Sequence, residues 1–421
     1  MEQDSFKVYG YRWIMLAVFM FIVAMNQLLW ITFASITGDA AKFYSVSDLS
    51  IGLLSMSFMI VYILVSIPAS WVIDTYGVRL GVGIGAALTA VFGLLRGLWA
   101  DNYSLVMVAQ IGIAVGQPFI LNAITTVAAR WFPVRERATA SGLGSLAMYL
   151  GILLGLALTP YLLVRFGIAG MLIAYGIVSV LAALVFFIFS RERPATPPCP
   201  PGMEARSLVF DGFKQIFRQR NFILLLIIFF IGLGAFNAVT TWIEDIVRPN
   251  GFTSTQAGII GGLMIVGGIV GALVIPTYSD RLRKRTPFIL IALAGATLGL
   301  AGIAYATSYW LLMASSFVMG FFLLSAGPIG FQYGAEITYP IPEGTSNGLL
   351  ILMGQISGIA FIFAMDSFRS PLTGSMTASL LVLIGLMVVS LALAFFLKEP
   401  KILLTGPQKP LEAALSQEST T

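Results

Sequence analysis

The segment DTYGVR, residues 74–79, separates two long apolar runs of the chain, and a matching segment, DRLRKR at residues 280–285, separates two more. A shift of 206 residues places Asp74 on Asp280 and Arg79 on Arg285. The same shift superimposes two glycine pairs, Gly52 with Gly258 and Gly142 with Gly348. An acid and a base that recur together in two equivalent short loops are hard to attribute to chance. The sequence therefore predicts a chain made of two repeated halves.

The apolar runs around these loops are long enough to cross a bilayer. Of the 421 residues, 58% are hydrophobic and only 10% are charged, whereas soluble domains carry about 25% charged residues. A spanning helix needs about 20 mostly apolar residues, and the alternating pattern of membrane barrel strands is absent. Twelve stretches qualify as helices: 11–36, 50–73, 80–99, 104–129, 138–163, 169–190, 222–247, 256–277, 287–306, 309–331, 347–368 and 376–397. We therefore expect an all-α integral membrane protein with twelve transmembrane helices in two six-helix bundles.

The Lys and Arg residues predict how the chain is oriented. If both termini lie on one side of the membrane, 19 of the 24 basic residues fall on that side. The other five are Lys42, Arg96, Arg165, Arg248 and Arg369. Because loops rich in Lys and Arg stay in the cytoplasm, we expect a multi-pass cell-membrane protein with both termini cytoplasmic. The net charge of +5 then reflects topology and anionic lipid rather than nucleic-acid binding.

A polar, proline-rich stretch divides the two predicted bundles. The N-terminal bundle covers residues 11–190 and the C-terminal bundle residues 222–397, with cytoplasmic tails at 1–10 and 398–421. The linker, residues 191–221, includes an amphipathic segment from Ser207 to Arg220 that we expect to lie on the inner membrane surface. We expect a monomer whose partners are a small solute and the lipid bilayer.

The composition excludes several kinds of chemistry. The chain has no His and a single Cys, Cys199. Imidazole catalysis, an intrachain disulfide and a cysteine-cluster metal site are therefore impossible. We expect neither an enzyme nor a resident cofactor.

The two short loops resemble the D-x-x-G-x-R loop signature of the major facilitator superfamily. The segment from Arg130 to Arg137, which precedes the fifth apolar run, also resembles a loop of that family. In the family, the acids and arginines of the signature hold the two bundles together on the cytoplasmic side. The resemblance implies this latching role for Asp74 and Arg79 in the first half and for Asp280 and Arg285 in the second.

Polar residues inside the spans are the candidates for contact with a solute, because burying them in lipid is costly. They are Asn26, Gln27, Gln110, Gln117, Asn122, Asn237, Thr240, Thr241, Gln332 and Gln355, with the polar-edged aromatics Trp30, Tyr149, Trp242 and Tyr333. For any one amide the alternative is a hydrogen bond between helices, and for Trp30 it is a place in the interfacial aromatic belt. We expect Trp30, Gln117 and Gln355 to line the pathway first, and Asn237 and Tyr149 second.

Acidic residues are scarce in the spans. Glu244 and Asp245 lie near the outer end of the seventh apolar run, and Glu336 and Asp366 end the tenth and the eleventh. Proton-coupled carriers place a titratable group within the pathway, and no acid occurs at mid-span. This favours a facilitator. If transport is coupled to protons, Glu244 is the candidate residue.

A closer resemblance is to the feline leukaemia virus subgroup C receptor family, which comprises carriers of choline, ethanolamine and haem. It rests on Tyr11-Arg12-Trp13 with Asn26-x-x-x-Trp30-Ile31, on Phe43-Tyr44-x-Val46-Ser47-Asp48-Leu49, on Ala114-x-x-Gln117-x-Phe119-Ile120-Leu121 and on the stretch from Glu336 to Leu350 with Gln355 beyond it. In choline-binding members a span-one Trp, a span-four Gln, a span-seven Tyr and a span-eleven Gln hold the ligand.

Transferred to this chain, the resemblance implies binding roles for Trp30, Gln117 and Gln355. The span-seven Tyr has no counterpart, since Asn237 follows Phe236, and Met148-Tyr149 replace an Asn-Gln pair of the family. Asn26 and Trp242 complete the candidate set, with Trp242 or Phe236 filling the missing aromatic wall. We expect a facilitator for a choline-like organic cation that works by alternating access. The alternatives are a proton-coupled exporter of lipophilic compounds or organic anions, and a haem carrier.

Overall fold

The computed structural model describes residues 8–400 except 134–135, 195, 197–215 and 339–342, so most of the linker and of its expected amphipathic segment lies outside the described residues. The first half contains α1 (Tyr11–Ile31), α2 (Thr37–Tyr44), α3 (Asp48–Tyr76), α4 (Val78–Leu98), α5 (Tyr103–Leu121), α6 (Ile124–Trp131) and α7 (Arg137–Phe189). The second half contains α9 (Arg220–Thr241), α10 (Ile243–Val247), η3 (Arg248–Asn250), α11 (Ser254–Leu282), α12 (Thr286–Tyr305), α13 (Tyr309–Thr338), α14 (Glu343–Ser367) and α15 (Thr377–Ala394).

Helix α7 accounts for two of the twelve expected spans. Eleven helices of the described chain are long and apolar enough to cross a membrane. One of them, α7, is 53 residues long, which at about 1.5 Å per residue is more than twice a bilayer core. Gly167 interrupts α7 with a φ of +66°, a conformation that glycine adopts without strain. The chain reverses there, so α7 supplies the fifth and sixth spans.

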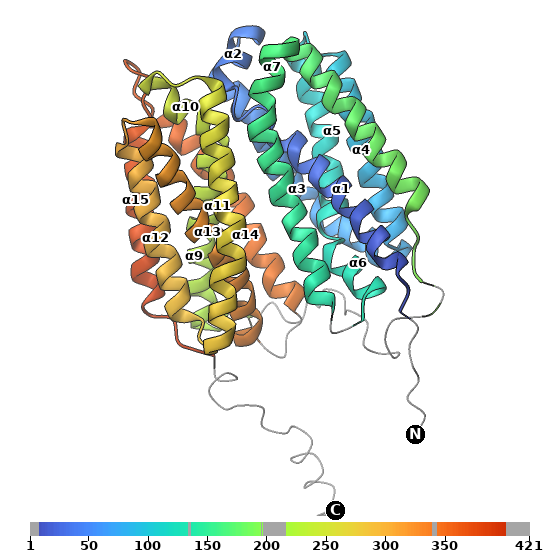
Figure 1. The fold of residues 1–421 in the computed structure, drawn as a ribbon. Coiled ribbons are helices and arrows are strands. Elements are labelled where there is room, and N and C mark those ends of the chain that lie inside the picture. The colour runs from blue at the N-terminus through green and yellow to red at the C-terminus, as the bar shows by residue number, and fades with distance from the viewer. Residues whose placement is uncertain (1–7, 134–135, 195, 197–215, 339–342, 401–421) are drawn as a thin grey trace, which may run out of the picture.

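The helices form two bundles side by side (Figure 1). Helices α1–α7 make one bundle and α9–α15 the other, and the bundles meet where α3 packs on α14 and α7 on α11. We call the end where α1 begins and α15 ends the terminal face, and the opposite end, which carries α2 and α10, the far face (Figure 1).

Two glycines related by the 206-residue repeat let the bundles approach each other. A Cβ atom added to Gly52 of α3 would lie 2.9 Å from the Trp242 ring of the other bundle. A Cβ atom added to Gly258 of α11 would lie 2.4 Å from the Leu156 carbonyl oxygen of the first bundle. The repeat thus places a side-chain-free position on each side of the interface.

Three expected spans are interrupted rather than continuous. The first ends at Ile31 and is followed by the short helix α2, the fourth breaks between α5 and α6 at Asn122 and Ala123, and the seventh breaks between α9 and α10 at Trp242. Apolar composition predicts burial but not these breaks. The break between α5 and α6 places Asn122 in the middle of the first bundle, and the break after α9 places α10 at the far face.

Arg96, which the charge pattern counted on the side opposite the termini, lies near that end of α4, but it is not a loop charge. It is fully buried near the end of α4. Its Nη1 donates to the Leu29 carbonyl oxygen at 2.9 Å and to Gln110 Oε1 at 2.7 Å, and its Nη2 donates to Thr32 at 3.3 Å. The guanidinium also lies over the Phe33 ring at 5.6 Å. Arg96 therefore joins α1, α4 and α5 inside the first bundle.

Candidate functional site

A large cavity separates the two bundles and is lined by residues from both. Its volume is about 2460 Å³. It reaches the terminal face, where Asp74, Glu192 and Arg193 from the first half and Asn347 from the second line its mouth. In the middle of the bundle it ends near Trp30 of α1 and Gln355 of α14.

Five of the seven residues in the candidate binding set line this cavity: Trp30, Gln117, Tyr149, Asn237 and Gln355. Gln27 and Asn122, two of the other polar residues expected inside the spans, line it as well. The five come from both halves, so a solute between the bundles can contact residues of each. Trp30 is held in place, because its Nε1 donates to the Ser55 carbonyl oxygen at 3.1 Å. Asn237 Nδ2 likewise donates to the Gly354 carbonyl oxygen at 3.1 Å.

The side-chain amides of Gln117 and Gln355 differ from Trp30 and Asn237 in their hydrogen bonding. Neither makes a hydrogen bond within the part of the chain that the structure describes. An amide offers two donor hydrogens and an accepting oxygen, and an unpaired amide next to a hydrated cavity is available to a ligand. The two free amides lie on opposite halves, on α5 and α14.

Asn122 was among the candidates for contact with a solute, but its hydrogen-bonded partners on α3 were not predicted as part of the site. Tyr62 donates to Asn122 Oδ1 at 2.7 Å, and Asn122 Nδ2 donates to Ser66 Oγ at 3.0 Å and to Ser70 Oγ at 2.9 Å. All four line the cavity, as does Asp74. The signal is present in the sequence, because Tyr62, Ser66, Ser70 and Asp74 are spaced by four residues and so share one face of α3.

The second half presents a mostly apolar wall to the same cavity. Its lining residues include Phe229, Leu233, Phe236, Ile269, Leu324 and Phe331. Phe229 and Phe331 pack together, with ring centres 5.2 Å apart. The cavity therefore has one polar wall and one apolar wall, which suits a solute with both kinds of surface.

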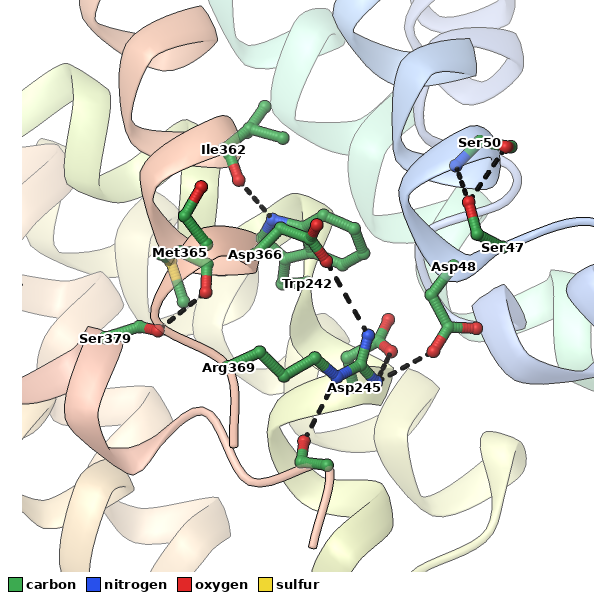
Figure 2. A network of polar contacts seen from close by, with 12 residues as sticks. Ser47, Asp48, Ser50, Trp242, Asp245, Ile362, Met365, Asp366, Arg369 and Ser379 are labelled. Atoms are coloured by element: carbon green, nitrogen blue, oxygen red, sulfur yellow. Dashed lines mark hydrogen bonds and ion pairs between the residues drawn. The ribbon is translucent and has the colours of Figure 1, made fainter. Parts of the chain in front are cut away.

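Two predicted contact residues, Asn26 and Trp242, do not line the cavity, which corrects the expectation for them. Asn26 is fully buried and donates to Thr89 Oγ1 at 3.2 Å. Trp242 is fully buried and donates to the Ile362 carbonyl oxygen at 3.1 Å (Figure 2). Its ring also packs on Gly52. Trp242 therefore belongs to the contact between the bundles at the far face.

Ion pairs between the two halves close the far face (Figure 2). Asp48 of α3 accepts from Arg248 at 2.7 Å and lies 2.8 Å from Arg369 Nη2. Glu244, the candidate for proton coupling, lies in the same region: its Oε2 accepts from the Gly38 backbone N–H of the first half at 3.0 Å and pairs with Arg248 at 3.4 Å. Glu244 does not line the cavity.

At the terminal face the described ion pairs stay within one half. Arg285 pairs with Asp280 and with Glu336, the latter at 2.9 Å. The equivalent pair of the first half is not formed in the described chain: the Arg79 backbone N–H donates to Glu192 Oε2 at 2.8 Å, while the cation acting on Asp74 is Arg130. The expected pairing of Asp74 with Arg79 is therefore corrected for this conformation. The cavity is open at this face and closed at the other.

Two six-helix bundles around a central cavity that opens at one face define a membrane transporter. The sequence pattern of the Major Facilitator Superfamily matches residues 13–362. The chain belongs to that superfamily.

Curated relatives cover nearly the whole chain. It is 30% identical to solute carrier family 49 member A3 of Xenopus tropicalis over 89% of this chain and 81% of the relative. It is 29% identical to the choline/ethanolamine transporter flvcr2b of Danio rerio, over 91% of this chain and 84% of the relative. The chain is 28% identical to the human choline/ethanolamine transporter FLVCR2, over 84% of this chain and 71% of the relative. Within the superfamily the chain thus resembles the feline leukaemia virus subgroup C receptor family.

A solved structure shares the fold. The chain is similar to a bacterial homologue of the human lysosomal transporter Spinster in an inward-facing, unoccupied conformation, with a TM-score of 0.73 and 15% identity. The similarity covers 96% of this chain and all of that one. At this identity it is evidence for the fold alone.

Proposed function

We propose that this protein is a facilitator that moves a choline-like organic cation across the cell membrane by alternating access. The observation that carries the proposal is the set of groups around the closed end of the cavity. Trp30 presents an aromatic ring there, and Gln117 and Gln355 present amides that have no hydrogen-bond partner among the described residues. The names of the relatives that transport choline and ethanolamine support the same class of solute.

The chemistry of these groups matches a quaternary ammonium with a hydroxyl. A cation over an indole ring gains about 2 kcal/mol or more when it is desolvated. A Gln amide can accept from the hydroxyl or donate to it. The acids of the described chain that line the cavity, Asp74 and Glu192, lie at the terminal mouth rather than beside Trp30. A cation held without a full counter-charge is bound weakly, which suits a carrier that must release its solute.

Alternating access follows from the asymmetry between the two faces. To open the far face, the bundles must separate Asp48 from Arg248 and Arg369, which lie on opposite halves. To close the terminal face, the loops that carry Asp74 and Asp280 must approach the other half. We assign the terminal face to the cytoplasm, because the Lys and Arg excess falls on that side. The structure then corresponds to a state open to the cytoplasm.

Uptake of radiolabelled choline into proteoliposomes tests the proposal. We expect saturable uptake by the native protein, and a rise in KM of about 30-fold for Trp30→Ala, the equivalent of about 2 kcal/mol of lost cation–π attraction. Trp310→Ala is the matched control, because Trp310 is 77% exposed and distant from the cavity lining. Absence of saturable uptake of both choline and ethanolamine contradicts the proposed solute class.

The apolar wall of the second half favours a second candidate, an exporter of lipophilic compounds. Phe229, Leu324 and Phe331 offer a lipophilic solute far more contact than choline needs. In a competition assay against labelled choline, an amphiphile with an ammonium head and an alkyl chain discriminates between the two. Competition that strengthens steadily with chain length supports the second candidate, whereas equal competition by short and long chains supports the first.

A further inference from the structure

The closed far face gathers more acids than bases. We call this group of side chains the far-face cluster: Asp39, Asp48, Glu244, Asp245, Arg248, Asp366 and Arg369. Its five carboxyl groups face two guanidinium groups, and the nearby Lys42 is exposed to water. Asp39 accepts from Ser254 of the other half, and Asp366 lies 3.9 Å from Arg369. Two of the five carboxyl groups, those of Glu244 and Asp245, are buried and the other three are partly buried, and such an excess of negative charge is costly unless something neutralises it.

Asp245 is the most enclosed member of the far-face cluster. Its side chain is completely buried. Its Oδ1 accepts from Arg248 and, at 2.7 Å, from Arg369, but its Oδ2 has no hydrogen-bond partner in the described chain. When a buried carboxylate oxygen has no hydrogen-bond donor, nothing compensates for the free energy lost on removing it from water.

Asp48 brings a second carboxyl group to the same place from the other half. Both guanidinium groups of the cluster contact its Oδ2, and the same two nitrogens, Arg248 Nη2 and Arg369 Nη2, also contact Asp245 Oδ1, so the two carboxyl groups lie next to each other (Figure 2). Two carboxylates in contact repel each other unless one of them holds a proton. A single proton held by this pair removes one negative charge and with it this repulsion, and Asp245 Oδ2, which has no hydrogen-bond partner in the described chain, is available to bind it.

We propose that Asp48 and Asp245 share one bound proton whenever the far face is closed, and that the far-face cluster therefore makes opening of this face sensitive to the pH on that side. Burial, opposed by Arg248, raises the pKa of Asp245 to about 7, and Glu244 and Asp48 act in the same direction as burial. Burial also raises the pKa of Glu244. The inference rests on the alternating exposure proposed above, but not on the identity of the solute.

The proton acts as a regulator and is not carried across. Opening the far face moves Asp48 away from Asp245 and admits water, so the proton leaves to the side from which it came. None of the cluster residues lines the central cavity, so the closed cluster has no route to the terminal face through it. The proton binds the closed state more tightly than the open one, hence a fall in far-side pH favours closure, and this effect is lost as the pH rises through about 7.

Distances across the far face test this directly without any solute. Spin labels are attached at Leu98→Cys on α4 and Tyr305→Cys on α12, both well exposed at the far ends of their helices, in a Cys199→Ala background. Their distance distribution is measured by pulsed electron resonance at pH 7.5 and pH 5.5. We expect the ratio of closed to open populations to rise by roughly 20-fold at the lower pH for a site whose pKa is about 7 when closed and ordinary when open.

Substitutions in the far-face cluster identify the side chains responsible for the pH dependence. Asp245→Asn resembles the protonated acid, so we expect its distances to be independent of pH, and Asp48→Asn provides the same test from the other bundle if Asp245→Asn does not fold. Asp101→Asn is the control, because Asp101 is an exposed acid at the far face outside the cluster. A pH-independent distribution in the native protein overturns the proposal, as does a pH response that persists in both cluster variants.

Discussion

The side chains of Gln117 and Gln355 show what the sequence can and cannot predict about a polar residue inside a span. A polar amide in the middle of an apolar span either joins two helices or faces a pathway, and the sequence leaves both options open. The structure distinguishes them, because these two amides line the cavity with no hydrogen-bond partner in the described part of the chain, whereas the Asn26 amide donates to Thr89. Which of the two roles a residue takes depends on helix rotation, and the hydropathy pattern does not specify rotation.

The partners of Asn122 in its polar network, Tyr62, Ser66 and Ser70, were not predicted for a related reason. Ser66 and Ser70 are small and occur in an apolar span, where serine also occurs as an ordinary packing residue. Only their four-residue spacing with Tyr62 and Asp74 indicates that they form a polar face of the helix. Asn122 itself reaches them because the chain breaks between α5 and α6, and no sequence signal announces that break.

Arg96 allows a prediction about stability. Its guanidinium bonds to three partners on two other elements at once, and a lysine ammonium cannot reproduce that fork. We expect Arg96→Lys to destabilise the first bundle by about 1–3 kcal/mol, seen as a lower midpoint of thermal unfolding in detergent. Arg165→Lys is the control, because Arg165 is exposed beside Tyr161. Equal midpoints for both variants contradict the structural role of Arg96.

At the scale of elements, the repeat explains why certain glycines occur where they do. Gly52 and Gly258 occupy equivalent positions of α3 and α11 and face the opposite bundle, whereas Gly142 and Gly348, also equivalent, have open space around them. Sequence comparison of the halves finds both pairs but does not tell a packing glycine from an unconstrained one. That difference arises only when the two bundles are placed together.

Substitution of these glycines should therefore have different effects. We expect Gly52→Ala and Gly258→Ala to shift the protein away from the state with a closed far face, by about 1–3 kcal/mol each, because the added methyl group overlaps Trp242 or the Leu156 backbone. The distance between labels at Leu98 and Tyr305 measures the shift. Gly142→Ala and Gly348→Ala are matched controls that should leave the distribution unchanged, and a similar shift in all four variants argues against interface packing as the cause.

The sequence predicts which segments cross the membrane, but not where a helix breaks within a segment. The twelve apolar stretches correspond to crossing segments of the structure, because length and hydropathy alone determine what enters lipid. The break at Trp242 was not predicted, since the segment from 222 to 247 is mostly apolar as far as Ile243 and contains neither Pro nor a charged residue before Glu244. This break directs Glu244 and Asp245 toward the other bundle, where they contribute to closure rather than to the pathway.

At the scale of the whole molecule, orientation in the membrane is a separate prediction. If the terminal face is cytoplasmic, the linker that carries Cys199 is cytoplasmic too. We expect a membrane-impermeant maleimide to leave Cys199 unlabelled in intact cells and to label it after permeabilisation. Leu372→Cys in a Cys199→Ala background is the control for the other side, because Leu372 is 96% exposed in the loop after α14. Labelling of Cys199 from outside reverses the assignment.

The asymmetry between the two faces is the property of the whole molecule that the sequence could not predict. The repeat and the loop signature predict two similar bundles, and they are compatible with an opening at either face. The observed state depends on the balance between pairs such as Asp48–Arg248, which join the halves, and Arg285–Glu336, which do not. These partners are distant in sequence, and their pairing changes whenever the bundles move.

The most direct test of the central claim, that a choline-like cation binds between the bundles, is a structure determined with choline bound at a concentration that saturates uptake. We predict that its trimethylammonium group lies within about 6 Å of the centre of the Trp30 ring, with its hydroxyl group hydrogen-bonded to Gln117 or Gln355. Choline bound instead against the apolar wall of Phe229 and Phe331, or a cavity with no bound choline at that concentration, would contradict the account.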